Sequence, residues 1–207
     1  MNLTGRRDSL RRFYVPLGTA LARTGIHPNL ITLISLFLGT ASAYFFYHEK
    51  LLTALALFIL SGLFDLLDGV VARETDRASK FGAVFDWVAD KWVDGLVLGA
   101  VGLAYSSPHV AVLAITVSML HSFIKPVAYA EIGFSERIKG KIKDPLERVG
   151  FFGRPETHIT LILFALSERA HLPFGLDLGM KIIVLLSLSS LILRILYLYR
   201  NYGKEYE

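Results

Sequence analysis

Six long apolar segments constrain the fold of this chain more than any other feature of its sequence. A helix needs about 20 largely apolar residues to cross a bilayer. The stretch from Leu30 to Tyr47, for example, carries no charged side chain. We interpret six segments as membrane spans: residues 30–47, 51–72, 81–105, 109–130, 155–172 and 178–199.

Composition supports this interpretation. Hydrophobic residues make up 53% of the 207 residues and charged residues only 19%, with a mean hydropathy of +0.49. Soluble domains usually contain about a quarter charged residues. We therefore predict an all-α integral membrane protein whose residues 1–207 form a single membrane domain, and we expect no nucleic-acid partner. The chain has no cysteine, so any metal must be bound by oxygen or imidazole ligands.

The distribution of basic residues predicts the orientation of the spans. Apart from Lys50, Arg169 and Lys181, the basic residues fall in the N-terminal segment, the 73–80 and 131–154 connections, the C-terminal tail or the adjoining helix ends. Short loops rich in Lys and Arg stay on the cytoplasmic side. We therefore expect both termini inside, in the cell membrane, which agrees with an even number of spans.

The segment 4–24 precedes the first span. Phe13, Leu17 and Leu21 alternate with arginines in a pattern typical of an amphipathic helix on the inner membrane surface. Pro28 favours this interpretation because it separates the segment from the first span. The alternative is a disordered basic tail.

Four aspartates lie at the ends of two neighbouring spans. Asp65 and Asp68 are spaced i,i+3 near the end of the second span, and Asp86 and Asp90 are spaced i,i+4 near the start of the third. Each pair therefore shares one face of its helix. Since the two spans form a hairpin, the four carboxylates are expected to converge at its cytoplasmic end.

Such a cluster predicts a divalent metal site. Carboxylates in a membrane are costly and usually functional, and several together repel one another unless cations lie between them. Oxygen ligands suit magnesium, manganese or calcium rather than zinc, and magnesium commonly completes its coordination with water and substrate phosphates. This points to phosphoryl transfer. A structural ion-pair network with neighbouring basic residues would explain one or two aspartates but not four in paired spacing.

Two glycines accompany the aspartates. Gly69 and Gly82 would allow a phosphate or a sugar to approach the backbone closely. Both are equally consistent with close packing of membrane helices, for which small residues are favoured.

Together these residues resemble a known signature. The chain carries Asp65-x2-Asp68-Gly69-x2-Ala72-Arg73-x8-Gly82-x3-Asp86-x3-Asp90. This pattern is similar to the complete signature of the CDP-alcohol phosphotransferases, and the six-span layout with a surface helix resembles that family too. Pro28-Asn29-x2-Thr32 is similar to a weaker family element.

The resemblance implies a reaction. In this family an acceptor hydroxyl attacks the β-phosphorus of a CDP-linked substrate and CMP leaves. By position, the metal ligands would be Asp65, Asp68, Asp86 and Asp90, binding Mg²⁺ or Mn²⁺ as two ions. Asp90 would also act as the catalytic general base. The CDP-lipid, CDP-diacylglycerol or CDP-archaeol, would be bound by Gly69, Arg73 and Gly82. Family members that this chain resembles form homodimers, so a homodimer is expected.

Three basic side chains indicate what kind of acceptor the enzyme would bind. Lys125, Arg154 and Arg194 are predicted at the level of the aspartates, which suggests an acceptor that is itself a phosphate monoester. The alternative is snorkelling toward lipid headgroups. The three resemble positions of the subgroup that makes phosphatidylinositol phosphate or archaetidylinositol phosphate. Thr157 departs from that subgroup's Arg-Pro-Glu-Arg element, so glycerol 3-phosphate and serine remain alternative acceptors.

Several polar residues near these motifs have a simpler interpretation. Asp94 continues the Asp90 face and could tune Asp90 or bind the acceptor, but a polar contact with a neighbouring span is the favoured interpretation. We expect His158, His121 and His109 to be ordinary hydrogen-bonded residues.

Two other classes use aspartates in membrane helices. An Asp-rich membrane prenyltransferase usually has two separated aspartate motifs, whereas both pairs here lie on one hairpin. A cation transporter is expected to have its carboxylates near the middle of its spans.

Overall fold

The computed structural model is a bundle of long helices, and it describes residues 7–133, 137–138, 141–142, 146 and 149–203. Within these residues the helices are α1 (Arg7–Ala22), α2 (Pro28–Tyr47), α3 (Leu51–Glu74), α4 (Lys80–Tyr105), α5 (Pro108–Glu131), α6 (Arg154–Arg169) and α7 (Leu176–Tyr202). The helical architecture predicted from the sequence is confirmed. Each predicted span coincides closely with one of the helices α2 to α7, although α6 ends three residues before the expected boundary at residue 172.

Four helices, α2, α3, α5 and α7, are long and apolar enough to cross a membrane. The other two candidates differ for identifiable reasons. Helix α4 carries the acidic residues of the aspartate cluster in its first half, and α6 has 16 residues, which is short of the roughly 20 that a span needs.

The outer surface of the bundle is apolar. Phe37 is 73% exposed, Val112 and Leu185 are each 63% exposed, and Tyr199 is 72% exposed. A soluble monomer rarely exposes large contiguous apolar patches. These side chains therefore suit contact with lipid rather than with water.

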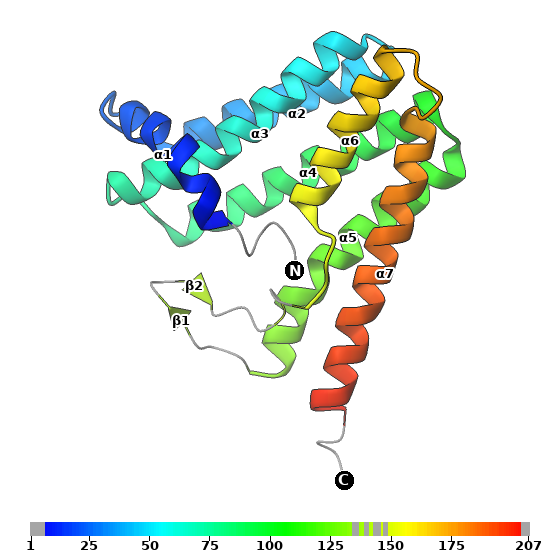
Figure 1. Ribbon diagram of the computed structural model, residues 1–207. Coiled ribbons are helices and arrows are strands. Elements are labelled where there is room, and N and C mark those ends of the chain that lie inside the picture. Colours follow the sequence, from blue (N-terminus) through cyan, green and yellow to red (C-terminus); the bar gives the residue numbers. More distant parts are fainter. Residues whose placement is uncertain (1–6, 134–136, 139–140, 143–145, 147–148, 204–207) are drawn as a thin grey trace.

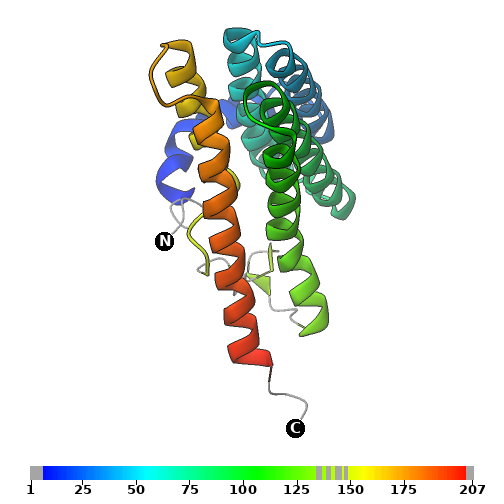
Figure 2. The same ribbon diagram turned by 90° about the vertical axis from the view of Figure 1, so that its right-hand side faces the viewer.

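The connections separate to opposite ends of the bundle. The short turns between α2 and α3, α4 and α5, and α6 and α7 gather at one end, at the top of Figures 1 and 2. Helix α1, the α3–α4 turn and the C-terminal end of α7 lie toward the other end (Figure 1). The second group contains the ends that are rich in Lys and Arg.

A small antiparallel pair of strands lies in the connection between α5 and α6. Strands β1 (Arg137–Ile138) and β2 (Lys141–Ile142) are paired, with Arg137 opposite Ile142. These strands lie in a connection and leave the all-α architecture unchanged, and two residues are too few to show the alternation that identifies a strand in a sequence. Lys139, Lys143 and Arg148, the other basic residues of this connection, lie outside the described residues.

Helices α2 and α3 are held together by reciprocal hydrogen bonds. Ser35 Oγ donates to the Ser61 carbonyl at 2.9 Å, and Ser61 Oγ donates to the Ser35 carbonyl at 2.8 Å. A Cβ atom placed on Gly39 would lie 2.5 Å from Val93 of α4. Small residues and hydroxyl groups between helices are typical of membrane proteins, where close backbone approach drives packing.

Helix α1 packs against α3 near the site. Tyr14 is buried with Val70 and Val71, while Phe13 and Leu17 are exposed. The sequence placed Phe13 and Leu17 on one apolar face, and the structure leaves both on the outside of the protein.

Candidate metal and CDP-alcohol site

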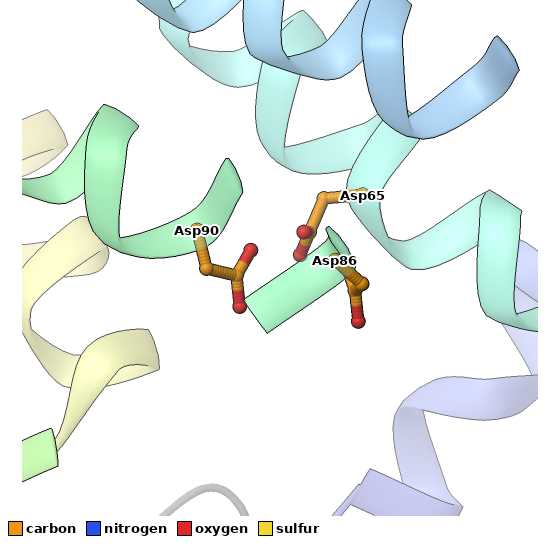
Figure 3. Close-up of side chains that lie close together, drawn as sticks. All are labelled: Asp65, Asp86 and Asp90. Carbon is orange, nitrogen blue, oxygen red and sulfur yellow. The ribbon is translucent and has the colours of Figure 1, made fainter. Parts of the chain in front are cut away.

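The aspartate cluster forms where α3 and α4 meet. Asp65, Asp86 and Asp90 each offer one carboxylate oxygen, and these oxygens lie within 4.8 Å of one another. Figure 3 shows the three side chains gathered between the two helices. All three are partly buried. Three carboxylate oxygens at this separation form a donor set that fits a hard divalent cation such as magnesium or manganese.

Asp68 lies deeper in the protein than the other three. It is only 5% exposed, and its Oδ2 accepts a hydrogen bond of 2.6 Å from Thr32 Oγ1 of α2. The structure therefore brings three of the four predicted ligands into one group and places the fourth one helical turn away on α3. Thr32 belongs to the Pro28-Asn29-x2-Thr32 element, which was the sequence signal for its presence here.

Gly82 lies in the first turn of α4. Ser79 caps this helix, accepting a hydrogen bond of 2.9 Å from the Gly82 backbone N–H. A Cβ atom on Gly82 would lie 3.1 Å from Asn29 Oδ1, in the first turn of α2. The N-termini of α2 and α4 are thus close together, and helix N-termini favour bound anions such as phosphate.

Gly69 and Arg73 are neighbours on α3. A Cβ atom on Gly69 would lie 3.4 Å from Arg73 Nη1. Arg73 is an exposed residue in the last turn of the helix.

Arg154, at the first residue of α6, reaches into the aspartate cluster. Its Nη1 lies 2.8 Å from Asp90 Oδ1 and 3.0 Å from Asp65 Oδ2, and its Nε lies 3.1 Å from Asp94 Oδ1. The start of α6 is capped by the Gly153 backbone N–H, which donates to Glu156 Oε2 at 2.9 Å. The predicted acceptor-binding arginine therefore contacts the aspartates directly.

Asp94 is the most buried acidic group beside the cluster after Asp68. It is 6% exposed and accepts from Lys91 Nζ at 2.8 Å as well as from Arg154. His158 Nε2 lies 3.1 Å from Asp94 Oδ1. Sequence reasoning favoured a plain polar contact with a neighbouring span for Asp94, over a role in tuning Asp90 or binding the acceptor, and it left His158 as an ordinary hydrogen-bonded residue. The available signal was that Asp94 lies four residues after Asp90 on the same helical face.

Arg194 occupies a separate buried network. It is 3% exposed, and it donates from Nε to the Val149 carbonyl at 3.0 Å and from Nη1 to the His121 carbonyl at 2.9 Å. Ser190 Oγ is hydrogen-bonded to His121 Nε2 at 3.1 Å. This network fixes the backbone of the segment that leads into Arg154.

A small polar cavity lies beside Arg154, between α4, α5 and α6. Its volume is about 40 Å³, and its polar lining includes Lys91, Ser118, His121 and Ser122. This is about the room that one water molecule needs, and it is too small for a polyol phosphate. Lys125, the third predicted acceptor-binding cation, is half-buried on α5.

Comparison with known proteins identifies the class. The model of the CDP-alcohol phosphatidyltransferase family matches residues 25–199 of this chain. The chain belongs to this family, and it is an enzyme that transfers a substituted phosphate group with the help of a metal. Membership decides against the prenyltransferase and the cation transporter.

Several relatives carry more specific names. Phosphatidylinositol phosphate synthase from Corynebacterium glutamicum is 25% identical over 202 residues, covering 94% of this chain and 87% of that protein. Archaetidylinositol phosphate synthase from Pyrococcus horikoshii is 33% identical over 87 residues, covering 42% and 46%. An uncharacterized protein of Aquifex aeolicus is 32% identical over 111 residues, and this chain spans only 56% of its length.

The fold is shared with a solved enzyme. Phosphatidylinositol phosphate synthase (PgsA1) of Mycobacterium tuberculosis with CDP-DAG bound superposes with a TM-score of 0.75, at 26% identity, over 95% of this chain and 98% of that one. The same enzyme in complex with manganese and citrate gives a TM-score of 0.75 at 25% identity, over 94% and 93%.

Proposed function

We propose that this enzyme transfers a phosphatidyl-type group from a CDP-linked lipid to a hydroxyl of inositol phosphate and releases CMP. The observation that carries the choice of acceptor is the position of Arg154 beside Asp90. Its guanidinium lies 2.8 Å from Asp90, the proposed base, so a phosphate bound to Arg154 would hold its polyol beside the group that takes the proton. The names of the relatives agree with this acceptor.

The chemistry follows from the cluster. Asp90 accepts the proton of the acceptor hydroxyl, whose oxygen forms the new bond to the β-phosphorus while the bond from that phosphorus to CMP breaks. Asp65, Asp68, Asp86 and Asp90 would hold two divalent ions, Mg²⁺ or Mn²⁺. When bound, these ions neutralise the negative charge that develops on the phosphate oxygens.

Binding of the donor would use the two adjacent helix N-termini. Gly82 of α4 and Asn29 of α2 leave room for the diphosphate near backbone N–H groups, and Arg73 offers a guanidinium beside Gly69. The proposed donor is CDP-diacylglycerol, the lipid bound to the related mycobacterial enzyme, or CDP-archaeol.

The acceptor pocket would use Arg154 and Lys125 as its direct cations. Arg154 binds the phosphate, and Lys125 approaches it from α5. Arg194, whose guanidinium is bonded to the Val149 and His121 carbonyls, would support the segment that leads into Arg154 instead of binding the phosphate as the sequence predicted. Glycerol 3-phosphate is the second candidate acceptor, because the same cations would bind its phosphate and because Thr157 departs from the subgroup pattern. Serine lacks a phosphate, and the cations therefore favour it least.

The proposed topology places this chemistry at the cytoplasmic face. Helices α2 to α7 would all cross the membrane, with α6 the shortest, and both termini would lie inside because the basic connections gather at that end. Helix α1 would lie on the inner membrane surface with Phe13 and Leu17 in the lipid. The protein would act as a homodimer.

A CMP-release assay tests the proposal. The purified protein in detergent is given CDP-diacylglycerol or CDP-archaeol, Mg²⁺, and one acceptor at a time: inositol phosphate, glycerol 3-phosphate or serine. CMP with inositol phosphate is the expected result. CMP with glycerol 3-phosphate alone would overturn the acceptor, and no CMP with any acceptor would overturn the proposed function.

A further inference from the structure

Arg154 lies where two metal-ligand candidates face each other. One nitrogen of its guanidinium, Nη1, pairs with both Asp65 and Asp90, at 3.0 and 2.8 Å. Asp65 and Asp90 also belong to the three carboxylates whose oxygens converge within 4.8 Å. The arginine thus neutralises the same side chains that a divalent cation would need.

The Nε atom of the same guanidinium pairs with a different carboxylate, that of Asp94. Arg154 Nε lies 3.1 Å from Asp94 Oδ1. Asp94 is 6% exposed and is fixed from two further directions, by Lys91 at 2.8 Å and by His158 at 3.1 Å. Asp94 is not one of the three convergent carboxylates.

We propose that Asp94 is a positioning residue that retains Arg154 when a divalent metal displaces it from Asp65 and Asp90. Through its pairs with Asp65 and Asp90, Arg154 is an internal counter-ion of the cluster. A divalent ion and a guanidinium repel each other at ion-pair distance, so they compete for the carboxylates of Asp65 and Asp90. The contact from Nε to Asp94 lets Nη1 leave without removing the arginine from the site.

Displacement of Arg154 Nη1 by the metal would affect binding of the acceptor. This effect on the acceptor rests on the proposed function. While Nη1 pairs with the aspartates, it is not available to a phosphate, and the adjoining cavity of about 40 Å³ is too small for a polyol. Metal binding would release Nη1 and let the pocket open. Metal therefore binds before the acceptor, and Asp94 keeps Arg154 beside Asp90.

Metal affinity tests the competition without any substrate. Mn²⁺ binding to the purified full-length protein in detergent is measured by electron paramagnetic resonance. We expect Arg154→Gln to lower the Kd on the order of tenfold, the change that corresponds to removal of a competing interaction of about 1.4 kcal/mol. Arg154→Lys should lie between wild type and Gln, since an ammonium cannot reach all three carboxylates in the fork geometry of arginine.

Asp94→Asn should shift affinity in the opposite direction. Without the carboxylate, Arg154 has no alternative charged partner at Nε and competes more strongly, so the Kd for Mn²⁺ should rise several-fold. The double variant Asp94→Asn/Arg154→Gln should bind like Arg154→Gln alone. Lys181→Gln removes an exposed lysine that pairs with Asp177 on α7, and it should leave the Kd unchanged.

The direction in which each variant changes the Kd for Mn²⁺ decides whether Arg154 competes with the metal and whether Asp94 limits that competition. A purely structural role for Arg154 predicts weaker metal binding in Arg154→Gln, and an unchanged or higher Kd in that variant would overturn the competition. Asp94→Asn with the affinity of wild type would overturn the role of Asp94. The Arg154→Gln protein should fold, because Asp94 keeps Lys91 and His158 as partners.

Turnover measurements distinguish a failure of the proposed role of Asp94 from a failure of the proposed function. In the CMP-release assay, Asp94→Asn should raise the acceptor KM more than it lowers kcat at saturating Mn²⁺. An unchanged acceptor KM would overturn the positioning of Arg154 even if the wild type releases CMP. If the wild type released no CMP with any acceptor, the proposed function would fall, while the Mn²⁺ measurements would still test the competition.

Discussion

Thr32 Oγ1 donates a hydrogen bond of 2.6 Å to Asp68 Oδ2, and this contact joins α2 to α3 beneath the aspartate cluster. Both residues are about 95% buried. A buried carboxylate needs such a partner, because a charged acceptor without a hydrogen bond is costly in the protein interior.

Replacing Thr32 by Val should therefore impair the site while preserving packing. The variant keeps the shape of the side chain but leaves Asp68 without this donor, a loss of about 1.5–3 kcal/mol for a hydrogen bond to a charged group. We expect kcat/KM for CMP release to fall by about tenfold or more. Thr32→Ser retains the hydroxyl and serves as the control. Equal activity of the Val and Ser variants would show that the hydrogen bond does not matter.

Asp90→Asn should separate catalysis from donor binding. The amide removes the proposed base but preserves the size of the side chain, so turnover should fall by at least about 100-fold, within the range that general base catalysis contributes. CDP-lipid binding, measured by titration calorimetry in detergent, should remain detectable. Turnover at the wild-type rate would rule out Asp90 as the base.

Much of this site could be predicted because its signals are local. Asp65 with Asp68 and Asp86 with Asp90 lie within one helical turn of each other, so helix geometry alone places each pair on one face. Because α3 and α4 are joined by a short turn, the two faces were expected to meet. The structure agrees for Asp65, Asp86 and Asp90.

The remaining features depend on contacts that no local pattern encodes. Arg154 reaches Asp65 across 89 residues of sequence, and Arg194 binds the backbone of His121 across 73. Which helices become neighbours decides such contacts, and membrane helices of similar apolarity can pack in many orders. For the same reason, the depth at which Asp68 and Arg194 are buried could not be read from their neighbours in the chain.

Gly39 offers a test of the close packing between α2 and α4. A Cβ atom there would lie 2.5 Å from the Val93 methyl carbons and 2.8 Å from Ser61 Oγ. Gly39→Ala should therefore destabilise the protein by about 1–3 kcal/mol through overpacking. Thermal unfolding in detergent measures the effect.

The matched control for Gly39 is Gly62, which lies in helix α3 and has nothing within 4 Å of an added Cβ. Gly62→Ala should be neutral or slightly stabilising, since alanine is the better helix former. Equal melting temperatures for the two variants would contradict the tight contact between α2 and α4.

Gly150 tests whether the backbone ahead of α6 sets the position of Arg154. It has φ +99°, a conformation that favours glycine, and an added Cβ would lie 2.7 Å from Ser190 Oγ and 3.1 Å from Arg194 Nε. Gly150→Ala should therefore disturb the network that holds this segment. The loss of stability should exceed the roughly 1–2 kcal/mol that the positive φ alone costs.

Gly25 is the control that isolates the backbone part of that effect. It also has a positive φ, of 76°, but nothing lies within 4 Å of an added Cβ. Gly25→Ala should therefore show the backbone cost alone. The difference between the two variants in thermal unfolding measures the contact with Ser190 and Arg194.

Only Gly150→Ala should also raise the acceptor KM, because displacement of the 149–153 segment moves Arg154 away from Asp90. If both variants left that KM unchanged while Gly150→Ala lost stability, the segment would support the fold without positioning the arginine.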